Sequence, residues 1–108
     1  MGQKEYTDIL TDKVIHERVR LLILTFLASS EEDVVLFTSI QNRLELSAGN
    51  LSVQLKTLSN AGYVKIAKKF VREKPQTSVK LTRKGRDALE KYLEGMEQLI
   101  RSMKNQNE

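Results

Sequence analysis

The chain has 108 residues, no cysteine, a net charge of +4 and a hydrophobic content of 40%. This length and composition suit one compact domain with a single core and argue against a disordered chain. The absence of cysteine excludes disulfide bridges and thiolate metal sites. Apolar runs such as Leu21–Leu24 are too short to cross a membrane, and the first residues lack the pattern of a signal peptide, so we expect a cytoplasmic protein.

The charge is distributed unevenly along the chain. Residues 41–86 contain eleven Lys or Arg residues and two acidic residues, a net charge of +9, whereas the rest carries −5. A basic middle segment between acidic ends is expected for a face that binds a polyanion. A Lys-rich surface that contacts only water would explain the charge as well, so the order of structural elements must decide.

Hydrophobic periodicity predicts the first elements. Apolar residues at intervals of three and four predict an amphipathic helix over about residues 12–28. A polar loop follows, and Val34–Leu36 predicts a short strand.

Two further helices are predicted close together. Thr38 or Ser39 would cap the first, and Ser47 is a good N-cap for the second, which should end near Asn60. Gly62 can adopt the left-handed conformation that stops a helix. Both helices would turn apolar residues towards the core, namely Ile40, Leu44, Leu51, Leu55 and Leu58. Two short helices joined by a tight turn form a helix-turn-helix.

A β-hairpin is predicted after these helices. Residues 63–70 mix apolar residues and lysines as a strand would, and residues 77–81 alternate as the returning strand. The loop between them, residues 71–76, has a basic tip and contains the only proline of the chain.

Thr82 is expected to cap a final long helix that ends near Met103. The order of elements therefore predicts a mainly α fold with a small β-hairpin wing, a winged helix-turn-helix. We expect one domain over residues 1–108, with the core and wing in 12–81 and a C-terminal dimerisation helix in 82–104.

The helix from Ser47 has the surface expected of a recognition helix. Its leucines share one face, and the other face is polar but mostly uncharged, which suits a DNA groove. Asn50 and Gln54 lie four residues apart, and each can make paired hydrogen bonds to adenine, although ordinary solvation explains either residue alone. Small residues at the helix N-terminus would allow a close approach to phosphate. The expected contacts are Ser47, Ala48, Gly49, Asn50, Ser52, Val53, Gln54 and Lys56.

The hairpin would supply a second set of contacts to double-stranded DNA. Arg72 at its tip could enter the minor groove or rest on phosphate. Cations at the start of the last helix are unfavourable, because the helix dipole is positive at that end. A bound phosphate would offset this repulsion. The expected wing and backbone contacts are Lys68, Lys69, Arg72, Lys74, Gln76, Thr77, Arg83 and Lys84.

The last helix carries an apolar stripe over about two to three heptads, as in a short coiled coil. Its first members could pack on their own domain, but the later ones would then form an exposed apolar patch. We therefore expect a symmetric homodimer, with half-sites about one helical turn apart. Tyr6, Ile9 and Leu10 of the N-terminal segment are candidate additions to this dimer interface. The expected interface contains Ile9, Leu10, Leu89, Tyr92, Leu93, Met96, Leu99, Ile100 and Met103.

The segments Leu46–Leu58 and Ala61–Val64 together resemble the recognition helix of MarR/ArsR-like winged-helix regulators. Thr77–Arg86 is similar to the end of their wing and the start of their next helix. The resemblance covers about residues 13–95 and is greatest to small stand-alone archaeal and bacterial members. It implies a dimeric, DNA-binding transcriptional regulator, commonly a repressor.

Two departures from the family limit what the resemblance implies. Metal-sensing members use Cys-containing or His/Asp-rich sites, and this chain has one histidine, His16, which we expect to be a surface or packing residue. We expect no metal and no cofactor. The added helices in which larger members hold drugs are missing, so a small-molecule effector at the dimer interface has no identified residues.

Three other classes of protein can be compared with the basic segment and the motifs of this sequence. An enzyme is not expected, because the sequence has no paired nucleophile and base and no Gly-rich phosphate loop. A non-sequence-specific architectural DNA-binding protein fits the same basic face. A winged-helix protein–protein interaction module also fits. An acidic protein partner, or RNA, would satisfy the same basic face as DNA.

Overall fold

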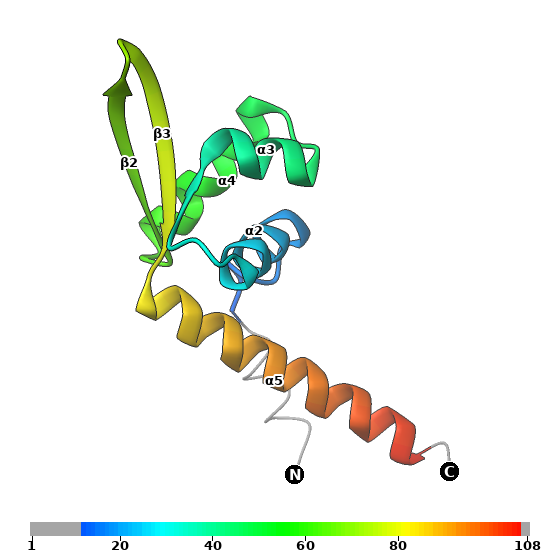
Figure 1. Cartoon of the computed structure of the whole chain (residues 1–108). Coiled ribbons are helices and arrows are strands. Elements are labelled where there is room, and N and C mark those ends of the chain that lie inside the picture. The colour runs from blue at the N-terminus through cyan, green and yellow to red at the C-terminus, as the bar shows by residue number, and fades with distance from the viewer. Residues whose placement is uncertain (1–11, 107–108) are drawn as a thin grey trace.

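The computed structural model describes residues 12–106, in which helices surround one side of a small sheet (Figure 1). The three antiparallel strands follow the order β1-β3-β2. The mainly α winged helix-turn-helix predicted from the sequence is confirmed. The elements are α2 (Arg18–Ser29), β1 (Val34–Leu36), α3 (Phe37–Leu44), α4 (Ala48–Asn60), β2 (Val64–Val71), β3 (Lys74–Leu81) and α5 (Arg83–Gln106).

Helix α2 begins six residues later than the start predicted at residue 12. The Asp12 carboxylate accepts hydrogen bonds from the backbone N–H groups of Val14 and Ile15, at 3.0 and 3.1 Å, and holds this segment in a turn. The Glu17 carboxylate then caps α2 by accepting from the N–H groups of its second and third residues. Side chains that bond nearby N–H groups favour caps and turns over continued helix. Ile15 is nevertheless fully buried, so the apolar periodicity extends past the helix itself.

The two short helices differ in how they begin. The prediction that Thr38 or Ser39 caps the first was wrong, because α3 starts at Phe37 with no side-chain cap. Leu36 pairs with Ser78 in the sheet, and this pairing fixes the extended backbone that leads directly into the helix. The predicted limits of the second helix are confirmed.

Ser47 Oγ accepts a hydrogen bond from the backbone N–H of Asn50 at 3.1 Å, as expected of the N-cap of α4. At the other end, Gly62 has a φ of +81°. This is the left-handed conformation that costs an L-residue about 1–2 kcal/mol and glycine much less.

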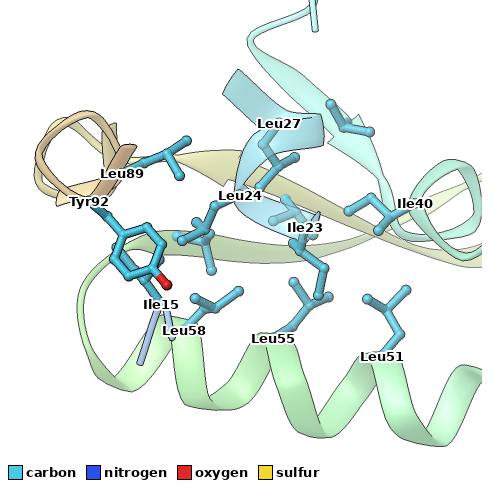
Figure 2. Packing of buried hydrophobic residues seen from close by; sticks show 13 residues of the cluster. Ile15, Ile23, Leu24, Leu27, Ile40, Leu51, Leu55, Leu58, Leu89 and Tyr92 are labelled. Atoms are coloured by element: carbon cyan, nitrogen blue, oxygen red, sulfur yellow. The ribbon is translucent and has the colours of Figure 1, made fainter. Parts of the chain in front are cut away.

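The hydrophobic core lies between the four helices and the sheet. Figure 2 shows the leucines of α4 pointing towards α2, with residues of α3 and α5 closing the two ends of the cluster. The buried apolar residues are Ile15, Ile23, Leu24, Leu27, Val35, Ile40, Leu51, Leu55, Leu58, Val64, Val79, Leu89 and Tyr92. Because three leucines hold one face of α4 in this cluster, its other face must point outwards.

Two residues expected in a dimer interface belong to this core. Leu89 and Tyr92 are only 3% and 4% exposed within the chain, so they have almost no surface left for a partner. They lie in the first half of α5, which packs against α2. These two residues face inwards because the stripe of α5 contacts the domain first and reaches solvent only where α5 extends past it (Figure 1).

The wing is longer and its turn tighter than predicted. Residues 71–76 were expected to form a loop, but β2 continues to Val71 and β3 starts at Lys74. Pro75 pairs with Phe70 inside the ladder. A proline is tolerated at this position because β1 pairs only with residues 78–80 of β3, so the outer edge of β3 is open here and needs no N–H donor.

Thr82 caps α5, as predicted, and ties the base of the wing together. Its Oγ1 accepts from the N–H of Gly85 at 3.0 Å and donates to the carbonyl oxygen of Gly62 at 2.6 Å. Its N–H donates to the carbonyl oxygen of Tyr63 at 3.0 Å. These bonds link the end of α4, the start of β2 and the start of α5, and so fix where the wing begins.

Tyr63 connects the wing base to the turn before α2, because its hydroxyl donates to Asp12 Oδ2 at 2.6 Å. Burial, this hydrogen bond and the charge of Asp12 raise the pKa of Tyr63 from 10.0 to about 12. The protonated phenol is therefore favoured in the folded state. Its contribution to stability is complete below pH 10 and is lost as the pH rises from 10 to about 12.

Tyr63→Phe is expected to lower the free energy of unfolding by about 1.5–3 kcal/mol at neutral pH, because it removes a hydrogen bond to a carboxylate. It should also remove part of the alkaline loss of stability seen in the unmodified chain. Urea unfolding between pH 7 and 11 measures both effects. Tyr92→Phe is the control, since it removes a phenol that bonds His16 instead of a carboxylate. An unchanged alkaline slope in Tyr63→Phe would contradict this assignment.

Candidate nucleic-acid interface

The outer face of α4 carries the side chains predicted to contact DNA. Val53 is 62% exposed, although it is apolar. Gln54 is the one half-buried member, at the boundary between this face and α2. The exposed members are Ser47, Ala48, Gly49, Asn50, Ser52, Val53 and Lys56. The face is therefore polar, open and free of acidic side chains.

A hydrogen-bonded chain crosses from α2 to this face. Arg20 Nη1 donates to Gln54 Oε1 at 2.8 Å, and Gln54 Nε2 donates to Asn50 Oδ1 at 3.1 Å. The guanidinium is itself held, because Nε donates to the carbonyl oxygen of Val14 at 2.7 Å and Nη1 lies 3.7 Å from a carboxylate oxygen of Glu17. Sequence reasoning missed Arg20, which lies 34 positions before Gln54 on another helix; no local spacing connects the two.

A hollow of about 390 Å³ separates α4 from the wing. Its walls include Ser52 and Lys56 from the helix and Lys68 and Thr77 from the two wing strands. The fold thus brings together residues predicted in both sets of contacts. The full lining is Phe37, Ser52, Leu55, Lys56, Ser59, Asn60, Ile66, Lys68 and Thr77.

The wing tip is a tight turn made by two charged residues. Arg72 and Glu73 have φ values of 52° and 65°, the left-handed region that such hairpin turns require. Asn-Gly suits this turn best, and each residue with a Cβ costs about 1–2 kcal/mol there. A long cation is therefore placed at the tip at the expense of local stability, a pattern associated with functional sites.

The two faces of the wing carry different residues, because neighbouring strand residues point to opposite faces. Lys68 and Thr77 pair on the face next to α4, and Lys69 pairs with Gln76 on the other face. Phe70 was expected to alternate as part of an apolar strand, but it is 77% exposed. The wing extends beyond the core at this point (Figure 1), and within residues 12–106 the ring is left largely open to solvent.

Arg83 and Lys84 lie at the opposite end of the wing from Arg72. The eight residues of β3 separate them from the tip, a distance of about 25 Å for an extended strand. Lys84 Nζ lies 5.9 Å from the ring centroid of Tyr63, and the Arg83 side chain is 3.8 Å from an Asp87 oxygen. The structure therefore does not gather all the predicted wing contacts at one place.

Comparison with known proteins settles the family. Residues 19–100 match the family described as winged helix DNA-binding domain. The chain belongs to this family. The resemblance to winged helix-turn-helix regulators noted in the sequence is thus confirmed.

One protein similar in sequence and two similar solved structures show how far this likeness extends. An uncharacterized protein of Methanocaldococcus jannaschii is 32% identical over 91 residues, which cover 84% of this chain and 97% of the relative. The structure of a transcriptional regulator homologue from Pyrococcus horikoshii OT3 superimposes with a TM-score of 0.84 at 28% identity, over 94% of this chain and 98% of the other. Reduced AbfR bound to DNA gives a TM-score of 0.68 at 25% identity, over 97% and 83% of the two chains.

His16 Nδ1 lies 2.7 Å from the hydroxyl oxygen of Tyr92, a contact between the turn before α2 and helix α5. Within residues 12–106, three or more His, Asp or Glu side chains do not cluster as a metal site would require. Among the helices described, none combines the length and the apolar character needed to cross a membrane.

Proposed function

We propose that this winged-helix domain is a sequence-specific double-stranded DNA-binding transcriptional regulator that acts as a homodimeric repressor. The observation that carries the proposal is the polar outer face of α4, which shares a basic hollow with the wing. Phosphate contacts from lysines position a protein on DNA, whereas uncharged amides and hydroxyls read base edges. Both kinds of group lie around this one hollow.

In the proposed complex, α4 lies in the major groove, and its first turns face the base edges. Lys56 and Lys68, on the two walls of the hollow, would contact backbone phosphates. The wing would then reach the neighbouring minor groove with Arg72, whose tip position suits a narrow groove. The complex of the relative AbfR with DNA supports this arrangement at the level of the fold.

The second half of α5 supports the dimer in the proposal. Leu93, Ile100 and Met103 are 43%, 49% and 60% exposed, and Met96 and Leu99 are half-buried. Figure 1 shows this half of the helix extending away from α2 and the wing. Ile9 and Leu10, also expected in the interface, lie outside the described residues, as does Tyr6. A second copy that covers this stripe would place two α4 helices on one duplex.

The proposed function is tested by selection of bound sequences from random duplex DNA at moderate salt. We expect one enriched, pseudo-palindromic site, bound roughly a thousandfold or more tightly than bulk DNA. The affinity should fall steeply with salt concentration, because bound cations release counterions from the phosphates. Binding without enrichment would instead show an architectural DNA-binding protein, and the absence of DNA binding would favour a protein partner.

Arg72→Asn tests the wing separately from α4. Asparagine tolerates the left-handed conformation, so the turn is kept while the cation is lost. We expect about tenfold weaker binding to all duplexes and a salt slope smaller by about one, without a change in the selected sequence. Lys91→Asn, an exposed cation on α5, is the matched control and should leave affinity unchanged. An equal loss in both variants would show that only net charge matters.

A further inference from the structure

We infer that Val53 selects thymine, because its side chain packs against the C5-methyl group of one thymine in the major groove of each half-site. The inference rests on the proposed function and names one base that the site selects. It starts from an apolar side chain, 62% exposed, on the mostly polar outer face of α4. In the major groove, the thymine methyl is the apolar group among the donors and acceptors of the base edges.

The hydrophobic core fixes which side of α4 faces outwards. Leu51, Leu55 and Leu58 are buried in one stripe, and successive residues of a helix are rotated by about 100°. Within the first two turns, Gly49 and Val53 lie closest to the line opposite this stripe, and Val53 is about 170° from its centre. Gly49 has no side chain. Val53 therefore carries the side chain that first meets the base edges when this face enters a groove.

The neighbouring polar side chains of α4 lie on either side of Val53. Asn50 and Gln54 are on the side towards α2, where Gln54 is hydrogen-bonded to that helix and donates to Asn50 Oδ1 at 3.1 Å. Ser52 and Lys56 are on the side towards the wing, where they line the hollow. The centre of the outer face is therefore apolar, with hydrogen-bonding groups on both flanks.

The stability of the fold does not account for a valine at this position. Val53 belongs neither to the buried cluster nor to the partly buried residues packed against it. Its branched Cβ also makes it a weaker helix former than alanine. An apolar contact with bound DNA would give this side chain a role that packing within the chain does not.

Val53 distinguishes thymine from the other bases in two ways. Contact removes the thymine methyl and the valine methyls from water together, and burial of apolar surface is favourable. At the same place on the base edge, cytosine lacks the methyl, and a purine presents N7, an acceptor that valine cannot satisfy. An acceptor that loses its water without gaining a donor is unfavourable. Thymine is therefore selected by attraction, and purines are excluded by desolvation.

Uracil in place of thymine tests the contact, because it removes only the methyl and keeps every donor and acceptor of the base pair. Each thymine of the selected duplex is replaced in turn, and the affinity is measured by titration. We expect one position in each half-site where the replacement weakens binding by about fourfold, the effect of exposing one buried methyl group. Val53→Ala should bind the thymine and uracil duplexes nearly equally at this position, because the valine methyls are gone.

Val34→Ala is the matched control, since it makes the same change at a valine of β1 that is 49% exposed and lies outside the proposed interface. It should keep the difference between thymine and uracil, and circular dichroism establishes that both variants are folded. The inference is overturned if no uracil replacement weakens binding by the unmodified chain, or if the same loss persists in Val53→Ala. In those cases the proposed regulator still binds a defined sequence, and only the role of Val53 fails. If the unmodified chain enriches no sequence at all, the proposed function and the inference fail together.

Discussion

A chain in which Ile100 and Met103 are both replaced by Glu is expected to be a monomer in solution. The two side chains are 49% and 60% exposed, the most open apolar positions in the second half of α5. A carboxylate placed in an apolar interface without a partner is strongly unfavourable. Because neither residue belongs to the core, folding of each chain should be little affected.

Loss of the dimer should be accompanied by a large loss of DNA affinity. Two linked recognition helices bind a double site with an affinity that can exceed that of one helix by a factor of about 100 to 10,000. Binding to a single half-site, by contrast, should change little. Sedimentation equilibrium measures the assembly, and titration of one-site and two-site duplexes measures the affinity.

A matched control changes charge without changing the apolar stripe. Lys91→Gln combined with Lys104→Gln lowers the net charge by the same two units at exposed polar positions of α5 and should leave the dimer intact. If the Ile100→Glu and Met103→Glu chain remains dimeric, the stripe is not the interface. If instead it unfolds at a lower temperature that does not depend on protein concentration, the stripe packs within its own chain.

Gly85→Ala is expected to lower the free energy of unfolding by about 3 kcal/mol, the upper end of the cost of overpacking. A Cβ at this position would lie 2.2 Å from the carbonyl oxygen of Tyr63 and 2.9 Å from its carbonyl carbon. Both neighbours are backbone atoms, so they cannot move aside as a flexible side chain could. The start of α5 would have to move away from the wing base, where Thr82 also bonds the Tyr63 carbonyl oxygen.

Gly49→Ala provides the matched control, because it makes the same chemical change in another helix. Apart from the adjoining residues and backbone of its own helix, no atom of the described residues lies within 4 Å of the Cβ it would add. Alanine is up to about 1 kcal/mol more favourable than glycine in a helix, so stability should be equal or higher. Urea unfolding of both variants gives the comparison. Similar losses in the two variants would show that the close contact at Gly85 does not limit stability.

Several elements could be predicted from the sequence because their signals are local. The spacing of Leu51, Leu55 and Leu58, with Ser47 before them and Gly62 after them, correctly gave both ends of α4. Capping and left-handed termination involve only a few neighbouring residues, so the chain itself carries the information. Thr82 gave the start of α5 for the same reason.

Other features of the fold were misplaced. The apolar stripe continues through Ile15, but backbone N–H groups that donate to the Asp12 and Glu17 carboxylates make that segment a turn. Pro75 suggested a loop, yet pairing with β2 extends the wing past it, since the outer edge of β3 is open there. In each case, periodicity reports which residues are buried but not which backbone conformation buries them.

The sequence by itself determined the order of elements, the polar outer face of α4 and the concentration of cations in residues 41–86. The tertiary structure decided how these parts meet. It divided the stripe of α5 into a buried start with Leu89 and Tyr92 and an exposed end, and it placed Arg20 against Gln54. The physical reason is the same for the α5 stripe and for Arg20. Burial and hydrogen-bond partners depend on atoms from other elements, and the spacing of residues along one element carries no information about those atoms.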